Sequence, residues 1–314
     1  MENLNRKAIV DIGSNSMRVV MYEIKDGTYK KIMDEKMFSG LITEIRKDKL
    51  TDVGLSKFCY FLNYAKELCR IADCNDISCF ATSAMRKVKN KEDIIALTKL
   101  KTGISTYVLS EEEETYYDCV SILSKVEETE GVALDMGGGS CQIFQFCDGK
   151  QANGKSFEIG SLFLYDKFVK GLVPTEKETR AIKQYVRKSL EKADNLKSLK
   201  YKEVYVFGGT MRAIYKLYDA MPYQKKENKR FDKEQDVLEA IKVKEIQMMI
   251  DKIYKMNLDG INILCHVIPE RVYTIIPGMI AIKQICRYLG INKIRLVDAS
   301  VREGYLIEAL KNES

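Results

Sequence analysis

The sequence is poor in histidine and proline, and each scarcity excludes a class of protein. Among 314 residues there is one histidine, His266. A single histidine argues against Ser-His-Asp and Cys-His catalysis and against histidine-rich metal sites. The 4 prolines and 19 glycines, beside 46% hydrophobic and 31% charged residues, exclude a disordered or collagen-like chain. Any catalysis must therefore rely on carboxylates, hydroxyls, backbone amides and a hard cation.

Features that mark a membrane, an export route or a nucleic-acid partner are also missing. The longest apolar run, Val272 to Ile282, falls short of the ~20 residues of a membrane span and contains Pro277-Gly278. The first residues have no apolar core of a signal peptide. The nine cysteines form no Cys-x-x-Cys pair, and the net charge is only +6. We therefore expect a cytoplasmic protein with buried thiols, no membrane or nucleic-acid partner, and at most an anionic ligand.

Two segments of the chain repeat one another. Ala8 to Val20 and Val132 to Phe144 both read as strand, tight turn, strand, and each second strand runs into an Asp-Gly turn. One constant offset superposes Asp11 on Asp135, Gly13 on Gly137 and Ser16 on Ser140. A length of 314 residues also predicts about two domains. We predict a duplicated domain with a cleft between the copies, the first copy at residues 1–118 plus 299–314 and the second at 119–298.

Glycine-rich turns at strand ends are the features of these copies that bear on chemistry. Their converging backbone amides can hold phosphate oxygens, and an aspartate at the strand end can hold Mg²⁺. A third turn of this kind follows the strand-like Glu203 to Phe207 and opens a helix. Each turn alone could be only a tight turn. The residues concerned are Gly13, Ser14, Asn15, Ser16, Gly137, Gly138, Gly139, Ser140, Gly208, Gly209 and Thr210. Strands alternate with helices between these turns, which predicts an α/β fold.

Four glutamates in a row begin a predicted helix after Ser110. Ser110 is a candidate helix cap, and Glu113 stands at the capping-box position. Acidic residues in a first turn stabilise a helix by ~0.3–1 kcal/mol each, which is one reason for them to be there. The other is that one carboxylate acts as a general base for water. Arg86, just past a predicted strand, could bind a phosphate or form a surface salt bridge.

With these residues in view, the chain resembles the exopolyphosphatase / guanosine pentaphosphate phosphohydrolase (Ppx/GppA) family nearly end to end. The matching motifs are Asp11-Ile12-Gly13-Ser14-Asn15-Ser16 with Arg18, Ala81-Thr82-Ser83-Ala84-Met85-Arg86 with Asn90, Leu109-Ser110 before Glu113-Glu114, Asp135-Met136-Gly137-Gly138-Gly139-Ser140, Gly208-Gly209-Thr210 and Arg302-Glu303-Gly304. The first two motifs together are highly specific. The resemblance implies duplicated ribonuclease-H-like domains of the actin, sugar-kinase and chaperone superfamily, in a short two-domain form.

The resemblance also implies a reaction and its residues. The reaction is hydrolysis of the terminal phosphate of inorganic polyphosphate or of guanosine pentaphosphate. Glu114 matches the family's catalytic base, with Glu113 beside it as a second catalytic candidate. Asp135, with Asp11 and Glu114, would bind Mg²⁺ and position water. The amides of the three glycine turns would hold the phosphates, assisted by Arg86.

Several family positions are altered, and two other functions therefore stay open. The altered positions are Glu111 for glycine, Thr115-Tyr116 for Ala-Arg, Cys141 for threonine, Phe163 for arginine, and Met37-Phe38-Ser39-Gly40 without its arginine. Fewer cationic contacts would weaken the binding of long polyphosphate. One alternative is a non-catalytic binder of guanosine tetra- or pentaphosphate, and another is an ATP-dependent kinase or filament protein of the same superfamily. The preferred substrate and a homodimeric state are left open by the sequence.

Overall fold

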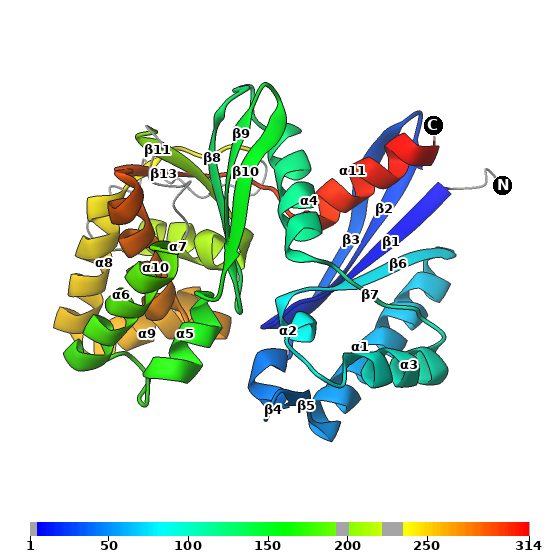
Figure 1. Cartoon of the computed structure of the whole chain (residues 1–314), viewed down its shortest axis with the longest axis horizontal. Coiled ribbons are helices and arrows are strands. Elements are labelled where there is room, and N and C mark those ends of the chain that lie inside the picture. The colour runs from blue at the N-terminus through cyan, green and yellow to red at the C-terminus, as the bar shows by residue number, and fades with distance from the viewer. Residues whose placement is uncertain (1–4, 193–200, 222–234, 314) are drawn as a thin grey trace. The chain divides into compact units, whose positions relative to one another are not determined.

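The computed structural model describes residues 5–192, 201–221 and 235–313, which form two compact units. Unit 1 comprises residues 1–114 and 306–314, and unit 2 comprises residues 115–305. The boundaries fall inside helices α4 (Glu111–Leu123) and α11 (Val301–Glu313). Each unit combines one mixed sheet with helices (Figure 1). None of the described helices is long and apolar enough to cross a membrane.

Unit 1 is built on a five-stranded sheet with the order β3-β2-β1-β6-β7. Strands β1, β2 and β3 are antiparallel neighbours, whereas β6 and β7 run parallel to β1. The elements are β1 (Asn5–Ile12), β2 (Ser16–Lys25), β3 (Thr28–Phe38), η1 (Leu41–Glu44), β4 (Ile45–Arg46), β5 (Lys49–Leu50), α1 (Asp52–Ile71), β6 (Asp76–Ala81), α2 (Ser83–Arg86), α3 (Lys91–Thr102) and β7 (Tyr107–Val108). This connectivity gives two antiparallel hairpins followed by parallel crossovers.

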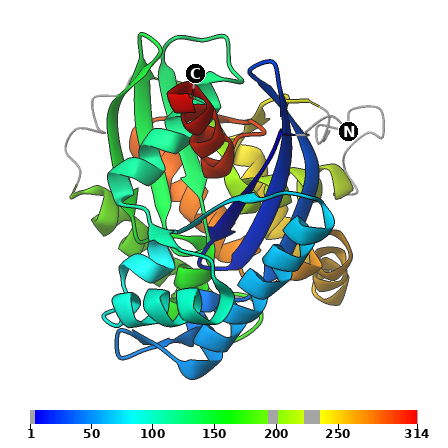
Figure 2. The ribbon, with the colours of Figure 1, turned by 90° about the vertical axis from the view of Figure 1, so that its right-hand side faces the viewer.

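The core of unit 1 follows from two hydrophobic periodicities. Helix α1 begins at its cap Thr51, whose side chain accepts from the amide of Gly54. Its buried residues recur at helical spacing and pack against alternate residues of β1 and β2. The packed side chains are Phe58, Phe61, Leu62, Ala65 and Cys69 on the helix, and Ala8, Val10, Ile12, Met17, Val19 and Met21 on the strands. In Figure 2, α1 lies along these blue strands, and α3 packs against α1.

Unit 2 repeats this sheet and adds one strand, in the order β10-β9-β8-β11-β13-β12. Again the first three strands are antiparallel, and β11 and β13 run parallel to β8. The elements are β8 (Gly131–Met136), β9 (Cys141–Cys147), β10 (Lys150–Phe157), α5 (Ser161–Phe168), α6 (Glu176–Leu190), β11 (Glu203–Phe207), α7 (Gly208–Ala220), β12 (Ile241–Lys242), α8 (Val243–Met256), α9 (Leu258–Val267), η3 (Pro269–Arg271), α10 (Ile275–Leu289) and β13 (Lys293–Leu296). The α/β class and the duplication are therefore confirmed at the level of strand order.

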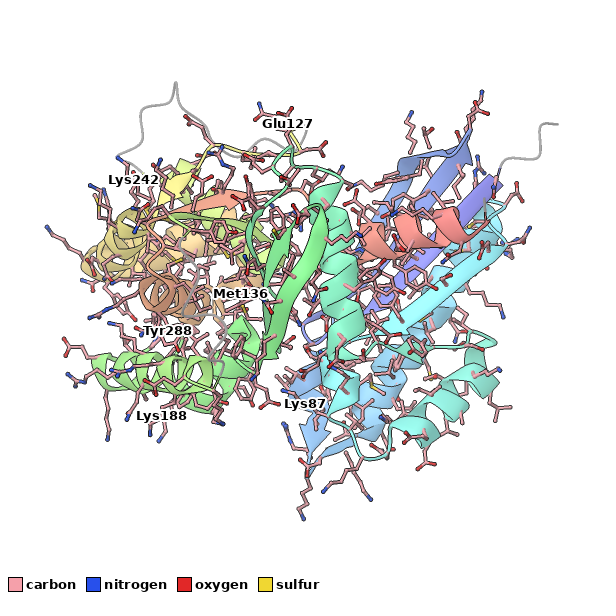
Figure 3. All side chains as sticks on the ribbon, turned by 45° about the horizontal axis from the view of Figure 1, so that its top comes forward. Lys87, Glu127, Met136, Lys188, Lys242 and Tyr288 are labelled. Carbon is pink, nitrogen blue, oxygen red and sulfur yellow. The ribbon has the colours of Figure 1, made fainter. Side chains whose placement is uncertain are left out.

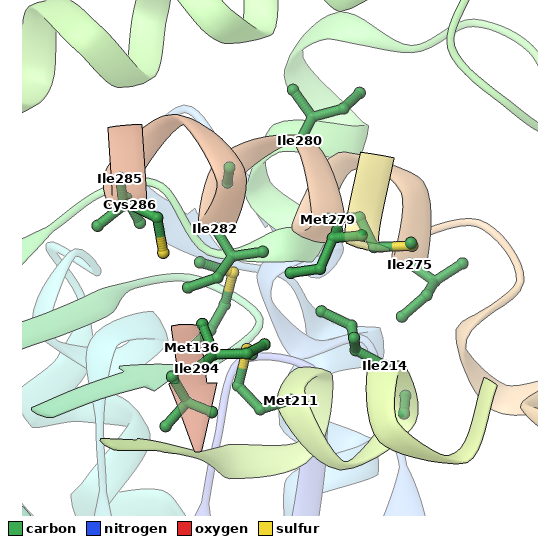
Figure 4. Close-up of a cluster of buried hydrophobic side chains, with 14 of the residues drawn as sticks. Met136, Met211, Ile214, Ile275, Met279, Ile280, Ile282, Ile285, Cys286 and Ile294 are labelled. Carbon is green, nitrogen blue, oxygen red and sulfur yellow. The ribbon is translucent and has the colours of Figure 1, made fainter. Parts of the chain in front are cut away.

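The central strands of the unit 2 sheet are buried on both faces, whereas the edge strand β10 is mostly exposed. Val204 and Val206 of β11 join the large core under α6, α7, α8 and α10, whereas Tyr205 and Phe207 join a smaller cluster with Cys119 of α4. Figure 4 shows the centre of the large core, where side chains of β8, α7 and α10 interlock. This double burial fixes the strand register, because a one-residue slip would exchange the two faces. It also fixes the strand ends that carry the candidate site.

Candidate active site

The β1–β2 turn of unit 1 is a tight turn that requires glycine at its first position. The Gly13 amide donates to the Ser16 carbonyl at 3.0 Å. A Cβ on Gly13 would lie 2.8 Å from that same oxygen, so no larger residue fits. The Asp26-Gly27 and Asp148-Gly149 turns also form as predicted, with positive φ at all four residues.

Neighbouring segments hold this turn through its carbonyl groups. The carbonyl of Asn15 accepts from the amides of Ser39 and Gly40, and that of Ser14 accepts from the amide of Ile42. Among the residues that the structure describes, the amides of Ser14 and Asn15 donate to no backbone or side-chain acceptor. The Nδ2 of Asn15 is also buried without a partner in the described chain. The turn therefore presents donors that an anion can satisfy.

The motif from Ala81 to Arg86 lies beside the turn. Ser83 Oγ and Ser14 Oγ are 2.7 Å apart and buried, and the Thr82 amide donates to the Ile12 carbonyl at 3.2 Å. The ends of β1 and β6 are thus joined at one edge of the sheet. This is the edge at which parallel α/β sheets bind ligands.

Glu114 and Arg86 form a buried ion pair in unit 1. Arg86 Nη1 lies 2.6 Å from Glu114 Oε2 and donates to the Leu109 carbonyl at 3.0 Å. The Glu114 residue is 7% exposed. The Nη2 of Arg86 is buried and has no hydrogen-bond partner among the described residues. A cationic donor therefore stands beside the predicted base and the glycine turn with one nitrogen available for a phosphate oxygen.

Glu113 has a different role from Glu114 at the start of α4. Its Oε2 accepts from the Ser110 amide at 2.8 Å, and its own amide donates to Ser110 Oγ at 3.1 Å. The capping box is therefore confirmed. Its other oxygen accepts from the Tyr107 hydroxyl at 2.8 Å, and this bond raises the pKa of Tyr107. Both carboxylate oxygens of Glu113 are thus bonded in the helix cap.

The glycine turn of unit 2 has the same internal bond as that of unit 1. The Gly137 amide donates to the Ser140 carbonyl at 3.0 Å. The start of α5 supports this turn through main-chain bonds: the Ser161 amide donates to Gly137, and those of Leu162 and Phe163 donate to Gly138. The amides of Gly138 and Gly139 donate to no acceptor in the described part of the chain. The sequence did not predict this supporting role of the α5 start.

Gly160 makes that support possible. A Cβ at Gly160 would stand 2.5 Å from the carbonyl carbon and oxygen of Gly138. Only glycine lets the start of α5 lie this close to the turn. Because amides at the start of α5 bond the carbonyls of the turn, the amides of the turn itself face away from α5.

Asp135 and Gly208 meet at the ends of two parallel strands. Phe207 pairs with Asp135 in the β8–β11 register, and Gly208 follows with φ +84°. A Cβ on Gly208 would lie 2.0 Å from Asp135 Oδ1. The glycine therefore makes room for this carboxylate. Gly208 is itself the first residue of α7, so the third glycine turn forms the helix start.

A buried arginine, Arg271, lies behind this helix start and was missed by the sequence analysis. Arg271 is 6% exposed, and its Nη1 donates to Thr210 Oγ1 at 3.2 Å. Its Nη2 would be 2.1 Å from a Cβ on Gly209. Burial lowers the pKa of Arg271 to about 10, so the guanidinium stays charged at neutral pH. Thr210 also bonds Ser161 Oγ at 3.0 Å, which ties α5, α7 and η3 together.

The predicted site residues thus fall into one group in each unit. Unit 1 carries Asp11, Gly13, Ser14, Asn15, Ser16, Arg86, Glu113 and Glu114, and unit 2 carries Asp135, Gly137, Gly138, Gly139, Ser140, Gly208, Gly209 and Thr210. In the described residues, no three Asp, Glu, His or Cys side chains gather as a metal site. Asp11 and Asp135 each stand next to a glycine turn as single carboxylates. Mg²⁺ commonly binds one or two carboxylates together with substrate phosphates, so this donor set suits Mg²⁺ and not an all-protein cage.

Known proteins share this chain's sequence features and fold. The bifunctional 3-dehydroquinate synthase/phosphatase of Fusobacterium nucleatum is 26% identical over 98% of this chain, which spans only 47% of that relative. Exopolyphosphatase 1 of Mycobacterium leprae is 20% identical, with 98% of this chain and 91% of the relative covered.

Two solved structures share the fold. A Ppx/GppA family member from Aquifex aeolicus has a TM-score of 0.76 at 22% identity, with 99% of both chains covered. An exopolyphosphatase from Cytophaga hutchinsonii has a TM-score of 0.84 at 20% identity, with 98% of both chains covered. The family model of the Ppx/GppA phosphatases matches residues 6–313. The chain therefore belongs to the Ppx/GppA phosphatase family.

Proposed function

We propose that this protein hydrolyses the terminal phosphoanhydride bond of inorganic polyphosphate, with guanosine pentaphosphate as the second candidate substrate. Membership of a phosphatase family supports the reaction class, and the exopolyphosphatases among the relatives favour polyphosphate. The observation that carries the proposal is the pair of glycine turns. In each unit, neighbouring segments donate to the carbonyls of a turn at a strand end. The amides of Ser14 and Asn15 in unit 1, and of Gly138 and Gly139 in unit 2, are unpaired within the described chain. Such donors suit a chain of phosphate oxygens.

Glu114 is assigned the role of general base. It would take a proton from the attacking water, so that the oxygen can add to the terminal phosphorus while the bridging oxygen leaves with the rest of the chain. Its ion pair with Arg86 places a positive charge 2.6 Å from the carboxylate, where it also orients that group. A positioned base of this kind contributes ~10²–10⁴-fold to the rate.

The remaining residues bind and neutralise the phosphates. The amides of Ser14, Asn15, Gly138 and Gly139 donate to phosphate oxygens, and Arg86 adds its free nitrogen. Arg271 supports the start of α7 with a buried positive charge.

Asp11 and Asp135 are assigned to Mg²⁺, with Glu114 as a further oxygen donor. When bound, Mg²⁺ would neutralise phosphate charge that develops in the transition state. This assignment does not require a site in which carboxylates alone surround the ion. Each aspartate supplies one oxygen ligand at a turn whose amides already face the substrate.

Replacement of Glu114 by glutamine tests the proposal, because it keeps the size of the side chain but removes the base, together with the negative charge that pairs with Arg86. Phosphate release from polyphosphate and from guanosine pentaphosphate, each with Mg²⁺, should fall ~10²–10⁴-fold. Glu112→Gln is the matched control, since Glu112 is exposed on the same helix turn and its loss should leave the rate within about twofold. Binding of either substrate should survive in Glu114→Gln.

Two results would change this assignment. An unchanged rate in Glu114→Gln would exclude Glu114 as the base. Binding without phosphate release from either substrate in the unmodified protein would instead favour the non-catalytic binder. The family arginines that the resemblance implies and this chain lacks, at Tyr116, Phe163 and Met37 to Gly40, motivate this second reading.

A further inference from the structure

A cationic groove lies on unit 2 between α6, α8 and α10. It consists of two pockets of about 660 and 540 Å³ that share Lys183. The first pocket is bordered by the N-terminal half of α6, and the second by its C-terminal half, from Lys183 to Glu191. In Figure 3, Lys188 and Tyr288 mark the C-terminal halves of α6 and α10. From Glu176 to Glu191 the groove follows α6 for about 22 Å.

Positive charges recur along both walls of this groove. Helix α6 contributes Arg180, Lys183 and Arg187 at spacings of three and four residues, which places them on one face. Helix α10 contributes Lys283 and Arg287, again four residues apart. These five cations outnumber the three carboxylates of the groove, which are Glu176, Asp251 and Glu191. The groove is therefore a row of like charges and not a single charged spot.

Three of these cations have no ion pair among the described residues. Arg187 Nε is 2.8 Å from Glu191 Oε1, and Arg180 Nη1 is 3.9 Å from Glu176 Oε2. Lys183 and Arg287 form no such pair, and the Lys283 amine donates to Gln247. Burial lowers the pKa of Lys283, and the charges of Lys183 and Arg287 add to this lowering, partly opposed by Asp251. Like charges held together in a hollow repel one another, and a bound anion would relieve that repulsion.

We propose that this groove is a second binding site that holds an inorganic polyphosphate chain away from the bond that is cleaved. A single phosphate would occupy one pocket, whereas a linear polyanion can follow both walls across the shared Lys183. The two tyrosines of the groove use their hydroxyls on backbone carbonyls, Tyr254 on Pro174 and Tyr288 on Leu190. These two hydroxyls are therefore already bonded, and the five cations are the charged donors that line the groove. The identity of this polymer rests on the proposed function.

Helix α10 borders the groove and also reaches the candidate site of unit 2. Gly278, in the first turn of α10, would place a Cβ 2.6 Å from Thr210 Cγ2 and 3.2 Å from Ser161 Cβ. Lys283 and Arg287 follow at about 8 and 14 Å along the helix axis. The first turn of α10 therefore contacts the candidate site, and residues from its middle and C-terminal turns border the groove. A chain bound in the groove would stay attached while its end is shortened, which compensates for missing cationic contacts such as the one at Phe163.

Direct binding tests this proposal without requiring turnover. Long-chain polyphosphate is titrated into the Glu114→Gln protein and into the same protein with Lys183→Glu and Arg287→Glu added. The added reversals should raise Kd about tenfold or more at low salt and reduce its salt dependence. Lys150→Glu with Lys202→Glu is the control, because both lysines are exposed in unit 2, border neither pocket and change the net charge equally. Its Kd should stay within about twofold.

Kinetics and a competitor separate this proposal from the proposed function. If the protein hydrolyses both substrates, KM can be compared for long-chain polyphosphate and for tripolyphosphate. The ratio of the first KM to the second should rise at least about fivefold in Arg287→Gln, which removes one exposed charge without reversing it. Equal Kd values for the groove variant and the control variant would overturn the proposal that the groove binds polyphosphate. Single-stranded RNA that binds as tightly and loses binding in the same variant would overturn polyphosphate as its ligand. Absence of hydrolysis would refute the proposed function and leave the binding result standing.

Discussion

Replacing Gly208 by alanine should disable the candidate site by moving one carboxylate. Gly208 has φ +84°, where an L-residue costs about 1–2 kcal/mol. The new Cβ would also lie 2.0 Å from Asp135 Oδ1, so the carboxylate must shift by about 1 Å or more to reach an ordinary contact distance. A misplacement of about 1 Å at a reacting site reduces the rate ~10²-fold.

Gly290→Ala is the matched control for this change. Gly290 has φ +71° in the same unit, and a Cβ there would meet nothing within 4 Å. It therefore carries the backbone strain without the collision. Thermal unfolding should show a lower midpoint for both variants, by about 2–8 °C. Mg²⁺-dependent phosphate release should fall ~10²-fold in Gly208→Ala alone.

The two variants decide whether the position of Asp135 matters for activity. Unchanged phosphate release in Gly208→Ala would refute the assignment of Asp135 to the site. A loss of activity in Gly290→Ala as large as in Gly208→Ala would show that backbone strain alone accounts for the effect.

Two further predictions concern stability. Thr210→Val should lower the free energy of unfolding in urea by about 1–3 kcal/mol, because it removes the hydroxyl bonded by Arg271 and Ser161, whereas Thr210→Ser should retain it. A hydrogen bond from Lys57 lowers the pKa of Glu44 below 4.5. This ion pair therefore stabilises the protein fully above about pH 4.5 and is lost as the pH falls through the folded pKa. Glu44→Gln should weaken the fall in stability on acidification, and an unchanged pH profile would contradict it.

Local patterns in the sequence were sufficient to predict the turns and the duplication. The Asp-Gly hairpin turns and the Gly13 and Gly137 turns depend on residues next to one another, and their backbone requirements can be read directly. The helical spacing of apolar residues from Lys57 to Ala72 predicts a helix, and the structure has α1 there, begun earlier at Asp52 by the cap Thr51. The apolar residues from Gly103 to Leu109 predict a strand, but only Tyr107 and Val108 pair with β6.

The supporting contacts could not be predicted because they join distant parts of the chain. Arg271 meets Thr210 across 61 positions, and no local pattern marks an arginine as buried. Gly160 had a visible signal, a glycine after a strand and before a helix, but its partner Gly138 lies on another turn. Arg86 was expected to bind a phosphate or to form a surface salt bridge. The structure shows a buried ion pair with Glu114 and one nitrogen without a hydrogen-bond partner among the described residues, so phosphate binding by Arg86 stays a prediction.

The start of α5 fixes the shape of the Gly137–Ser140 turn through its main chain, and it sets the surface beside the turn through its side chains. The turn is fixed by main-chain amides of α5, which every residue except proline supplies. Gly160 and Ser161 are restricted in addition, because a Cβ at Gly160 would collide with Gly138 and the Ser161 hydroxyl bonds Thr210. The side chain of Phe163 can be exchanged without removing the amide that this residue donates to Gly138. The surface beside the turn can therefore change at position 163 while the main-chain bonds that fix the shape of the turn remain.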